Sequence, residues 1–288
     1  MAGRPEPQYL MPYNALKLEL DRELATLTFN RPEKRNALSP EMIEELLAAL
    51  DELEARGARV AIVTGAGKAF CAGMDLDALK ALATQTQEHK VLKGGVLKGG
   101  LPRPSDANLA DSRRMARLFR RIYDFPKPLI AAVNGPAIAG GCGIATLCDF
   151  TLAAPEARFG YTEVRIGFVP ALVSVFLIRQ IGEKRARDLL LSGRILDAEQ
   201  ARELGLVNEV APQDRLLERA RELAAELLAA SPTSLIYTKR LLRELSKEQL
   251  DRELELALQE NARIRSTADF REGLSAFLEK RKPVWRGE

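Results

Sequence analysis

Histidine and cysteine are scarce in this chain. Its 288 residues include one histidine, His89, and three cysteines, Cys71, Cys142 and Cys148. No two cysteines form a C-x-x-C pair, so the sequence predicts neither a disulfide framework nor a cysteine-ligated metal site. A single histidine also disfavours a Ser-His-Asp triad and a histidine-ligated metal centre. We therefore expect a cytoplasmic protein, in a reducing compartment, that binds no metal.

An excess of charge of one sign is missing as well. The 43 Lys and Arg residues nearly balance the 40 Asp and Glu residues, which gives a net charge of +3. Because the two signs are interspersed on helical segments, no basic domain for nucleic acid is indicated. A local binding site for an anion remains compatible with this balance.

The sequence also offers little for a membrane. Residues 1–13 mix prolines with both signs of charge, unlike a signal peptide. The run from Pro128 to Cys148 carries no charge over 21 residues, which is long enough to span a bilayer. Four glycines, two prolines and an asparagine interrupt it, however, and these residues predict turns. We expect no membrane partner.

Strand and helix patterns alternate over roughly the first half of the chain. Leu16–Leu20 and Leu24–Phe29 alternate apolar with polar or small residues, which predicts a hairpin with one solvated face. Ser39 and Pro40 are favoured at a helix start, and an amphipathic pattern follows to Arg56. Short buried strands are predicted at three further places, Val60–Val63, Leu129–Val133 and Phe150–Ala153. This alternation indicates an α/β fold.

Helical patterns dominate beyond about residue 172. We predict helices at Glu183–Leu191, Ala198–Leu204, Leu216–Ala230, Thr233–Leu245 and Gln249–Ile264. Residues 1–195 are expected to form the core, and residues 196–288 a helical region of the same fold. Between Leu76 and Arg113, clusters of glycine and proline interrupt every pattern, so residues 77–112 are expected to form a mobile loop.

Two glycine-rich segments each follow a predicted strand and precede a predicted helix start. They are Phe70–Leu76, with the sequence FCAGMDL, and residues 134–143, with the sequence NGPAIAGGCG. Small residues let a backbone approach a ligand closely, and N–H groups at a helix start can face an anion. Two such turns can converge on one ligand oxygen. Close helix packing is the alternative role for Gly140 and Gly141.

Together with the segment NRPEKRNAL at Asn30–Leu38, these two segments resemble the three ordered hallmarks of the crotonase family of enoyl-CoA hydratases and isomerases. The resemblance runs from about Leu16 to Trp285. It implies a crotonase-type ββα spiral core with a C-terminal helical trimerisation region, and a homotrimer or hexamer in solution. It also implies an acyl-CoA substrate and no separate cofactor, because CoA is part of that substrate.

The same resemblance assigns roles to individual residues. The N–H groups of Met74 and Gly140 would form an oxyanion hole around the thioester oxygen. Glu163, in the segment FGYTE, matches a catalytic glutamate of the family. The remaining implied contacts are with CoA or the substrate, and Lys280 could reach the phosphates from a neighbouring subunit. These contacts would come from Lys34, Arg35, Ala37, Ala72, Asp75, Leu76, Asp77, Gly141 and Lys280.

One position departs from the hydratase pattern, because Gly143 stands where hydratases of the family carry a first glutamate. Hydration is easiest with two carboxylates, whereas a double-bond shift needs one. We expect an enoyl-CoA hydratase-like enzyme with Glu163 as acid and base. Glu163 would act alone, or with a loop carboxylate from Asp77, Glu88 or Asp106. An isomerase that uses Glu163 alone stays open, as does a catalytically retired CoA- or RNA-binding protein.

Overall fold

A seven-stranded sheet forms the centre of the computed structural model, which describes residues 8–9, 13–85 and 104–287. Its two pairings at the β1 edge are antiparallel and the other four are parallel. The order is β1 (Gln8–Tyr9), β2 (Leu16–Asp21), β3 (Leu24–Phe29), β4 (Val60–Gly65), β5 (Leu129–Val133), β7 (Phe150–Ala153) and β10 (Glu209–Val210). The predicted α/β class is confirmed, as are the hairpin and the three buried strands.

A second, three-stranded sheet lies beyond the end of β5. It contains β6 (Ala137–Ile138), β8 (Arg158–Gly160) and β9 (Ile195–Asp197), with β6 parallel and β9 antiparallel to β8. The boundary that the sequence suggested at residue 195 therefore falls inside a strand of this sheet. Because β6 belongs to the second glycine-rich segment, the small sheet fixes that segment relative to β8.

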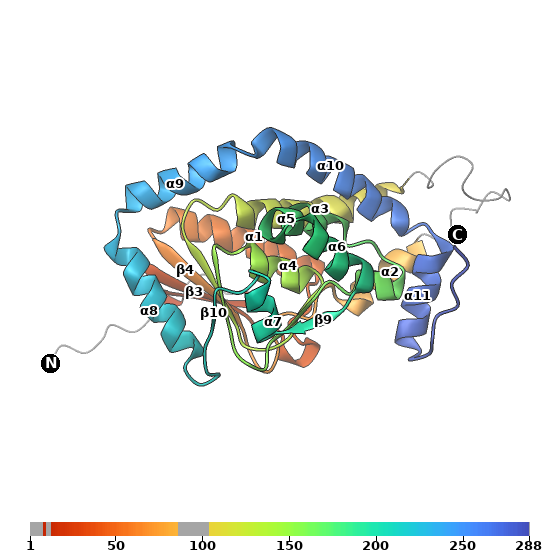
Figure 1. Ribbon diagram of the computed structural model, residues 1–288, viewed down its shortest axis with the longest axis horizontal. Coiled ribbons are helices and arrows are strands. Elements are labelled where there is room, and N and C mark those ends of the chain that lie inside the picture. The colour runs from red at the N-terminus through yellow and green to blue at the C-terminus, as the bar shows by residue number, and fades with distance from the viewer. Residues whose placement is uncertain (1–7, 10–12, 86–103, 288) are drawn as a thin grey trace.

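Helices cover both faces of the large sheet (Figure 1). On one face lie α1 (Pro40–Ala55), α3 (Asp106–Tyr123) and α4 (Gly140–Leu147), and on the other lies α8 (Leu216–Ala229). β4 shows why both faces are covered. Ala61 and Val63 join the larger core, whereas Val60 and Ile62 pack toward α8. Side chains alternate along a strand, so an apolar strand needs an apolar partner on each side.

The predicted start of α1 is confirmed in detail. Ser39 is extended, and its hydroxyl accepts a hydrogen bond from the Met42 N–H at 3.2 Å. Pro40 occupies the first helical position, where its missing N–H costs no intrahelical bond. The buried side of the helix, which includes Leu46 and Leu50, then packs into the core.

The remaining helices lie mostly in the C-terminal third, as predicted. They are α5 (Ala171–Ile181), α6 (Glu183–Ser192), α7 (Ala198–Glu203), α9 (Pro232–Glu244), α10 (Lys247–Ile264) and α11 (Ala268–Leu278). The five helices that the sequence predicted correspond to α6, α7, α8, α9 and α10, and each predicted end lies within two residues of the observed one. The helices α5 and α11 were not predicted. No helix in the described ranges has the length and apolar character needed to cross a bilayer.

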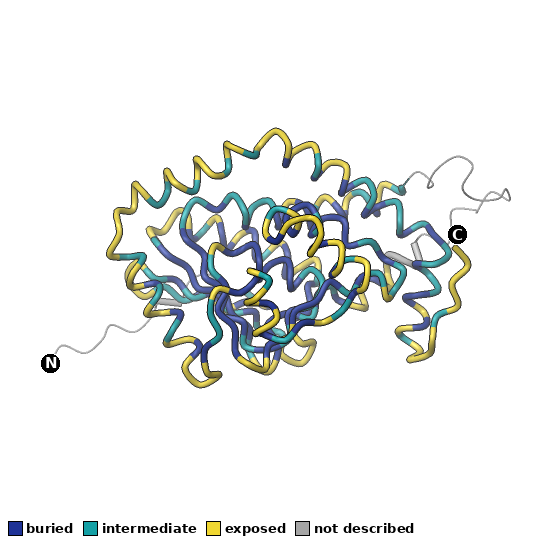
Figure 2. The backbone as a smooth tube through the Cα atoms, in the orientation of Figure 1, coloured by how far each residue is buried: buried dark blue, intermediate teal, exposed yellow. Residues whose placement is uncertain are grey.

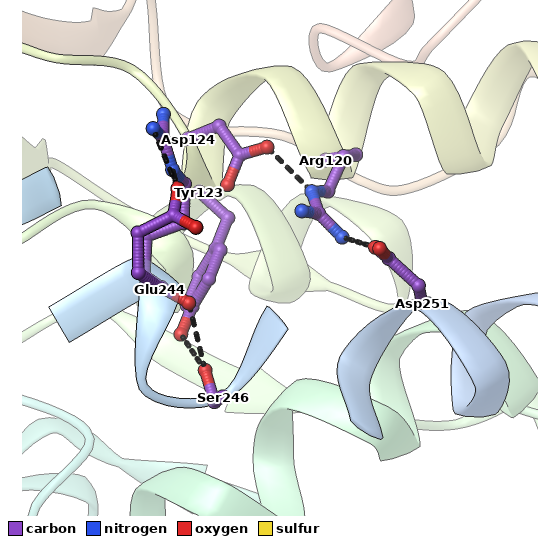
Figure 3. A network of polar contacts seen from close by, with 7 residues as sticks. Arg120, Tyr123, Asp124, Glu244, Ser246 and Asp251 are labelled. Carbon is purple, nitrogen blue, oxygen red and sulfur yellow. Dashed lines mark hydrogen bonds and ion pairs between the residues drawn. The ribbon is translucent and has the colours of Figure 1, made fainter. Parts of the chain in front are cut away.

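α9 and α10 form an arm across the top of the molecule in Figure 1. All of α9 is described, and none of its residues is buried, as the yellow and teal backbone in Figure 2 shows. Polar contacts hold the arm to the end of α3 (Figure 3). Arg120 bonds Asp251 at the start of α10, and the hydroxyls of Tyr123 and Ser246 lie 3.5 Å apart.

The prediction of an irregular loop at residues 77–112 was wrong at both ends. α2 (Leu76–Gln85) begins immediately after the first glycine-rich segment, and α3 begins at Asp106. Ser105 caps α3 by accepting a hydrogen bond from the Asn108 N–H at 3.2 Å. The glycine and proline clusters between these helices dominated the local pattern and hid both. Residues 86–103, with Glu88 and His89, lie outside the described residues.

Candidate active site

The two glycine-rich segments lie side by side beyond the ends of β4 and β5. Cys71 and Ala137 form a parallel bridge, in which Cys71 N–H donates to Pro136 O at 3.1 Å and Ile138 N–H donates to Cys71 O at 2.9 Å. Gly73, with φ of +88°, keeps the segments close, because a Cβ there would lie 2.9 Å from Ile138 O. Met74 and Gly140 each stand three residues beyond the bridge, so the register brings them level.

The N–H groups of Met74 and Gly140 are left available by this arrangement. Leu38 bonds the residues on either side of Met74, since its N–H donates to Gly73 O and its carbonyl accepts from Asp75 N–H. The Met74 N–H therefore points away from Leu38. Gly140 is the first residue of α4, where an N–H has no intrahelical acceptor. Among the described residues, no protein group accepts from either N–H, and both residues line one cavity.

Ala139 sets the direction of the Gly140 N–H group. It has φ of 51° and ψ of −123°, a conformation that costs a residue with a Cβ about 1–3 kcal/mol. Its N–H donates to Gly160 O at 2.7 Å and its carbonyl accepts from Gly143 N–H at 3.0 Å. The surrounding bonds thus hold a strained turn immediately before Gly140.

The cavity has a volume of about 810 Å³ and brings most of the predicted site residues together. Gly141 and Lys280 lie outside its lining. A Cβ on Gly141 would lie 2.3 Å from Cys71 O, so this glycine permits close packing, while Lys280 is exposed beyond the end of α11. The predicted residues that do line the cavity are Lys34, Arg35, Ala37, Ala72, Met74, Asp75, Leu76, Asp77, Gly140 and Glu163.

Glu163 supplies a buried carboxyl group to the same cavity. It begins a short 3₁₀ helix (Glu163–Ile166) three residues after Gly160, the residue that pairs with Ile138. Its Oε2 has no hydrogen-bond partner among the described residues. Burial raises the pKa of Glu163 from 4.5 to about 7, because the surroundings disfavour the charged form. A carboxyl with such a pKa can both accept and donate a proton near neutral pH.

Gly143 is enclosed by apolar side chains. A Cβ at this position would lie 2.7 Å from Val173 Cγ1 of α5 and 3.3 Å from the Phe119 ring of α3. A glutamate could not replace this glycine unless both neighbours moved. The space next to the Gly143 Cα is therefore taken by the side chains of Val173 and Phe119.

Comparison with known proteins shows the family of the chain. A sequence profile described as enoyl-CoA hydratase/isomerase matches residues 19–101 and 93–288. The chain belongs to the enoyl-CoA hydratase/isomerase family. A Thermus thermophilus protein provisionally named enoyl-CoA hydratase is 48% identical over 261 residues, covering 90% of this chain and 96% of its own length. The 2,3-dehydroadipyl-CoA hydratase of Escherichia coli is 37% identical over 268 residues, covering 91% and 94%.

A solved structure extends the similarity to the fold. The crystal structure of an enoyl-CoA hydratase/isomerase from Xanthobacter autotrophicus Py2 superposes with a TM-score of 0.79 at 34% identity, and the match covers 93% of this chain and 97% of that one. The crotonase-type fold expected from the sequence is thereby confirmed. Processing of acyl-CoA thioesters is the chemistry that this family membership supports.

The segment Asn30–Leu38, called the family segment below, owes its shape to the buried side chains of Asn36 and Asp75. Asn36 donates to the carbonyls of Ala66 and Ala69 and accepts from the Arg31 N–H, which fixes the turn against the first glycine-rich segment. Asp75 accepts from Arg31 at 2.9 Å and from the Asp77 N–H at 2.9 Å. Asp75 therefore positions the segment and the start of α2 rather than offering a free carboxylate.

Several charged residues of the lining are exposed on the family segment and on α2, which together form the mouth of the cavity. Lys34 and Asp77 form an exposed ion pair at 3.1 Å, which links the family segment to α2. Glu33 and Lys80 are also exposed there. Asp106, suggested as a second catalytic carboxylate, is exposed on the first turn of α3 and does not line the cavity.

All three cysteines are poorly placed to act as nucleophiles. All three are buried, and burial raises the pKa of the Cys71 and Cys142 thiols to about 12. The pKa of Cys148 is raised for the same reason. A thiol with such a pKa stays protonated at neutral pH and is a poor nucleophile.

Sequence analysis missed several residues that shape the cavity. Met115 and Phe119 of α3 and Asn261 of α10 all line it. The spacing of Met115, Leu118, Phe119 and Ile122 gives α3 a detectable apolar side. Asn261 carried no such signal, because its neighbours in the fold are distant in the sequence.

Proposed function

We propose that the protein catalyses a double-bond shift in enoyl-CoA thioesters, with Glu163 as its single acid and base. The environment of Gly143 carries this proposal, because glycine supplies no carboxylate there and Val173 and Phe119 occupy the space that a side chain would enter. Among the described lining residues, Glu163 is the one buried carboxyl without an ion-pair partner. Glu33 and Asp77 are exposed at the mouth, and Asp75 is bonded to Arg31.

The proposed reaction moves one proton from the alpha carbon to the gamma carbon of the acyl chain. The Glu163 carboxylate removes a proton from the alpha carbon of a 3-enoyl-CoA, and negative charge spreads over the dienolate onto the thioester oxygen. The N–H groups of Met74 and Gly140 donate to that oxygen, an interaction typically worth about 2.7–4 kcal/mol per donor in the transition state. The protonated Glu163 then returns the proton to the gamma carbon. The product is a 2-enoyl-CoA, and no further cofactor takes part.

Substrate binding follows from the same arrangement. The exposed charges of Lys34 and Arg35 at the mouth suit the phosphates of CoA. The apolar interior beyond Glu163 suits the acyl chain. Lys280 is exposed and lies outside the lining of its own cavity. It would therefore contact the phosphates of a CoA bound to a second copy of the chain.

Hydration of a 2-enoyl-CoA is the second candidate function. It is favoured by the names of the relatives, two of which are hydratases at 48% and 37% identity. Glu163 would then have to activate the water and deliver the proton to the alpha carbon in turn.

A paired assay separates these functions. Purified protein is given a 3-enoyl-CoA and, separately, a 2-enoyl-CoA, and both the shifted and the hydrated product are measured. Glu163→Gln is expected to lower kcat by about 10²–10⁴-fold. Glu156→Gln, which alters an exposed carboxylate on the turn before β8, is the matched control and should retain the rate.

Each outcome of the assay has a distinct meaning. Double-bond migration that depends on Glu163 supports the proposal. Hydration without migration replaces it with the second candidate. A full rate in Glu163→Gln contradicts the role of Glu163 in either reaction. Intact CoA binding without turnover of either substrate would indicate a retired, binding-only protein.

A further inference from the structure

A buried polar cluster borders the cavity between α3 and the end of α10. Arg265, which is 1% exposed, donates to Asp111 at 2.6 Å and to Asn261 Oδ1 at 3.0 Å. Ser112 donates to the same Asn261 oxygen at 2.8 Å. The rest of this end of the cavity is apolar, with Leu79, Met115 and Phe168 in its lining. Such a cluster is costly to bury, and packing alone does not require it.

These bonds fix the orientation of the Asn261 side chain. Arg265 can only donate, so the atom that it contacts must be the amide oxygen of Asn261. Both lone pairs of this oxygen are then used by Arg265 and Ser112. The Nδ2 group points the other way, and no described protein group accepts from it. Asn261 lines the cavity and its Nδ2 is not among the buried unpaired atoms, so the cavity is where this group is exposed.

The bond from Ser112 places Asn261 of α10 beside the N-terminal half of α3, away from Gly140. The Phe119 ring would lie 3.7 Å from a Cβ on Gly140, which puts Phe119 level with the Gly140 N–H. Ser112, the partner of Asn261, lies seven residues earlier on the same helix, so it is about 10 Å further along the axis. A medium-length acyl chain would reach from Gly140 to Asn261.

We propose that Asn261 is a specificity-determining residue that binds an acceptor oxygen near the distal end of the acyl chain. The inference rests on the proposed function only in that an acyl-CoA occupies the cavity. A hydrocarbon chain at this end would displace water from the Nδ2 group and leave it unpaired, whereas a carbonyl, hydroxyl or carboxylate oxygen would accept its hydrogen bond. Sites built around a polar group reject analogues that lack its partner.

The buried charge beside Asn261, on Arg265, is neutralised by Asp111, so the recognition is by a directed donor rather than by net charge. Asp111 faces Arg265 and also accepts from Arg114 at 3.2 Å, while Arg114 in turn pairs with Glu44 at 3.3 Å. Phe168 covers the Arg265 guanidinium with a ring centroid 5.4 Å away. The shared chemistry of the ligand is therefore an oxygen acceptor, whether neutral or anionic.

Binding of saturated acyl-CoA esters tests this inference without any turnover. Calorimetry would compare octanoyl-CoA with 7-oxooctanoyl-CoA and with octanedioyl-CoA. The wild-type protein is expected to bind at least one oxygenated ester about tenfold more tightly than octanoyl-CoA. Asn261→Asp keeps an oxygen for Arg265 and Ser112 but removes the N–H donors, so this variant should lose the preference. Asn261→Leu should lose it too.

Ser112→Ala is the matched control, because it removes one bond to the amide oxygen and leaves the Nδ2 donor in place. It should keep the preference even if it lowers stability. Equal binding of all three esters by the wild type would overturn the inference. A preference for octanedioyl-CoA alone that persists in Asn261→Asp and Asn261→Leu would assign recognition to charge, and would also overturn it. A failure of the proposed function, in contrast, would appear as absent turnover with these binding differences intact.

Discussion

The burial of Glu163 has a consequence for stability as well as for chemistry. The pKa of its carboxyl is 4.5 ordinarily and about 7 in the folded protein. The folded state therefore holds this proton at pH values where the unfolded chain has released it. Folding is penalised as the pH rises from about 4.5 to 7, and the full penalty applies above that window.

Glu163→Gln should remove this penalty. At pH 8 the variant is expected to be more stable than the wild type, with an upper limit on the order of 3 kcal/mol, and below pH 4.5 the difference should shrink toward a constant. Urea unfolding at several pH values from 4 to 8 measures this difference in the free energy of unfolding, with Glu156→Gln as the exposed control. A difference between Glu163→Gln and wild type that does not change with pH would contradict the raised pKa.

Gly143 allows a test of the closed volume beside the site. Gly143→Ala gains up to about 1 kcal/mol of helix propensity but forces a Cβ to 2.7 Å from Val173 Cγ1, and overpacking costs about 1–3 kcal/mol. We expect net destabilisation in the wild-type background. In a Val173→Ala background the clash is relieved, so the same change should become stabilising. A double-mutant cycle by thermal unfolding measures the coupling, and additive effects would show that Val173 does not enclose Gly143.

Two ion pairs that join α3 to α10 differ greatly in burial. Arg265 at the end of α10 is 1% exposed and is paired with Asp111 of α3, whereas Asp251, paired with Arg120, is half exposed. Breaking a buried pair leaves an uncompensated charge and costs about 3–5 kcal/mol, while an exposed pair contributes about 0–1 kcal/mol. The attachment of α10 to α3 therefore depends chiefly on the buried pair.

Two isosteric changes compare these contributions. Asp111→Asn should lower the free energy of unfolding by about 3 kcal/mol. Asp251→Asn, at the other end of the same helix pair, should lower it by less than about 1 kcal/mol. Urea unfolding with a common slope gives both values. Equal effects of the two changes would mean that burial does not control these pairs.

The exposed apolar side of α9 bears on the state of assembly. Tyr237, Leu241 and Leu245 follow one another at intervals of four residues, and their exposed fractions are 56%, 59% and 75%. Single exposed leucines are ordinary, but for a stripe of this kind on a helix without buried residues we expect a partner that covers it. The sequence resemblance predicts that this partner is another copy of the chain.

Sedimentation velocity should accordingly give a homotrimer or a hexamer at micromolar concentration. Leu241→Lys together with Leu245→Lys should shift the protein toward monomer, because charged residues are disfavoured in the core of an interface. Leu191→Lys, an exposed leucine on α6 with 74% exposure, serves as the control. A wild-type monomer would refute the prediction, and so would an assembly that the double change leaves intact.

Local patterns were enough to predict much of this protein. The cap at Ser39 and the alternation at Leu24–Phe29 depend on neighbours within a few residues, and the structure confirms both. The two glycine-rich segments and Glu163 were also found from short motifs. Glycine and proline clusters, in contrast, masked α2 and the start of α3, because helix signals compete with turn signals over the same few residues.

Contacts between distant residues required the folded chain. Sequence alone identified Gly143 as unusual, but only packing revealed that Val173 and Phe119, each more than twenty positions away, close the space beside it. The raised pKa of Glu163 and the orientation of Asn261 depend on burial and bonds supplied by other elements. The sequence thus indicated the family and the candidate residues of the site. The environment of its side chains came from long-range packing, which leaves no periodic trace along the chain.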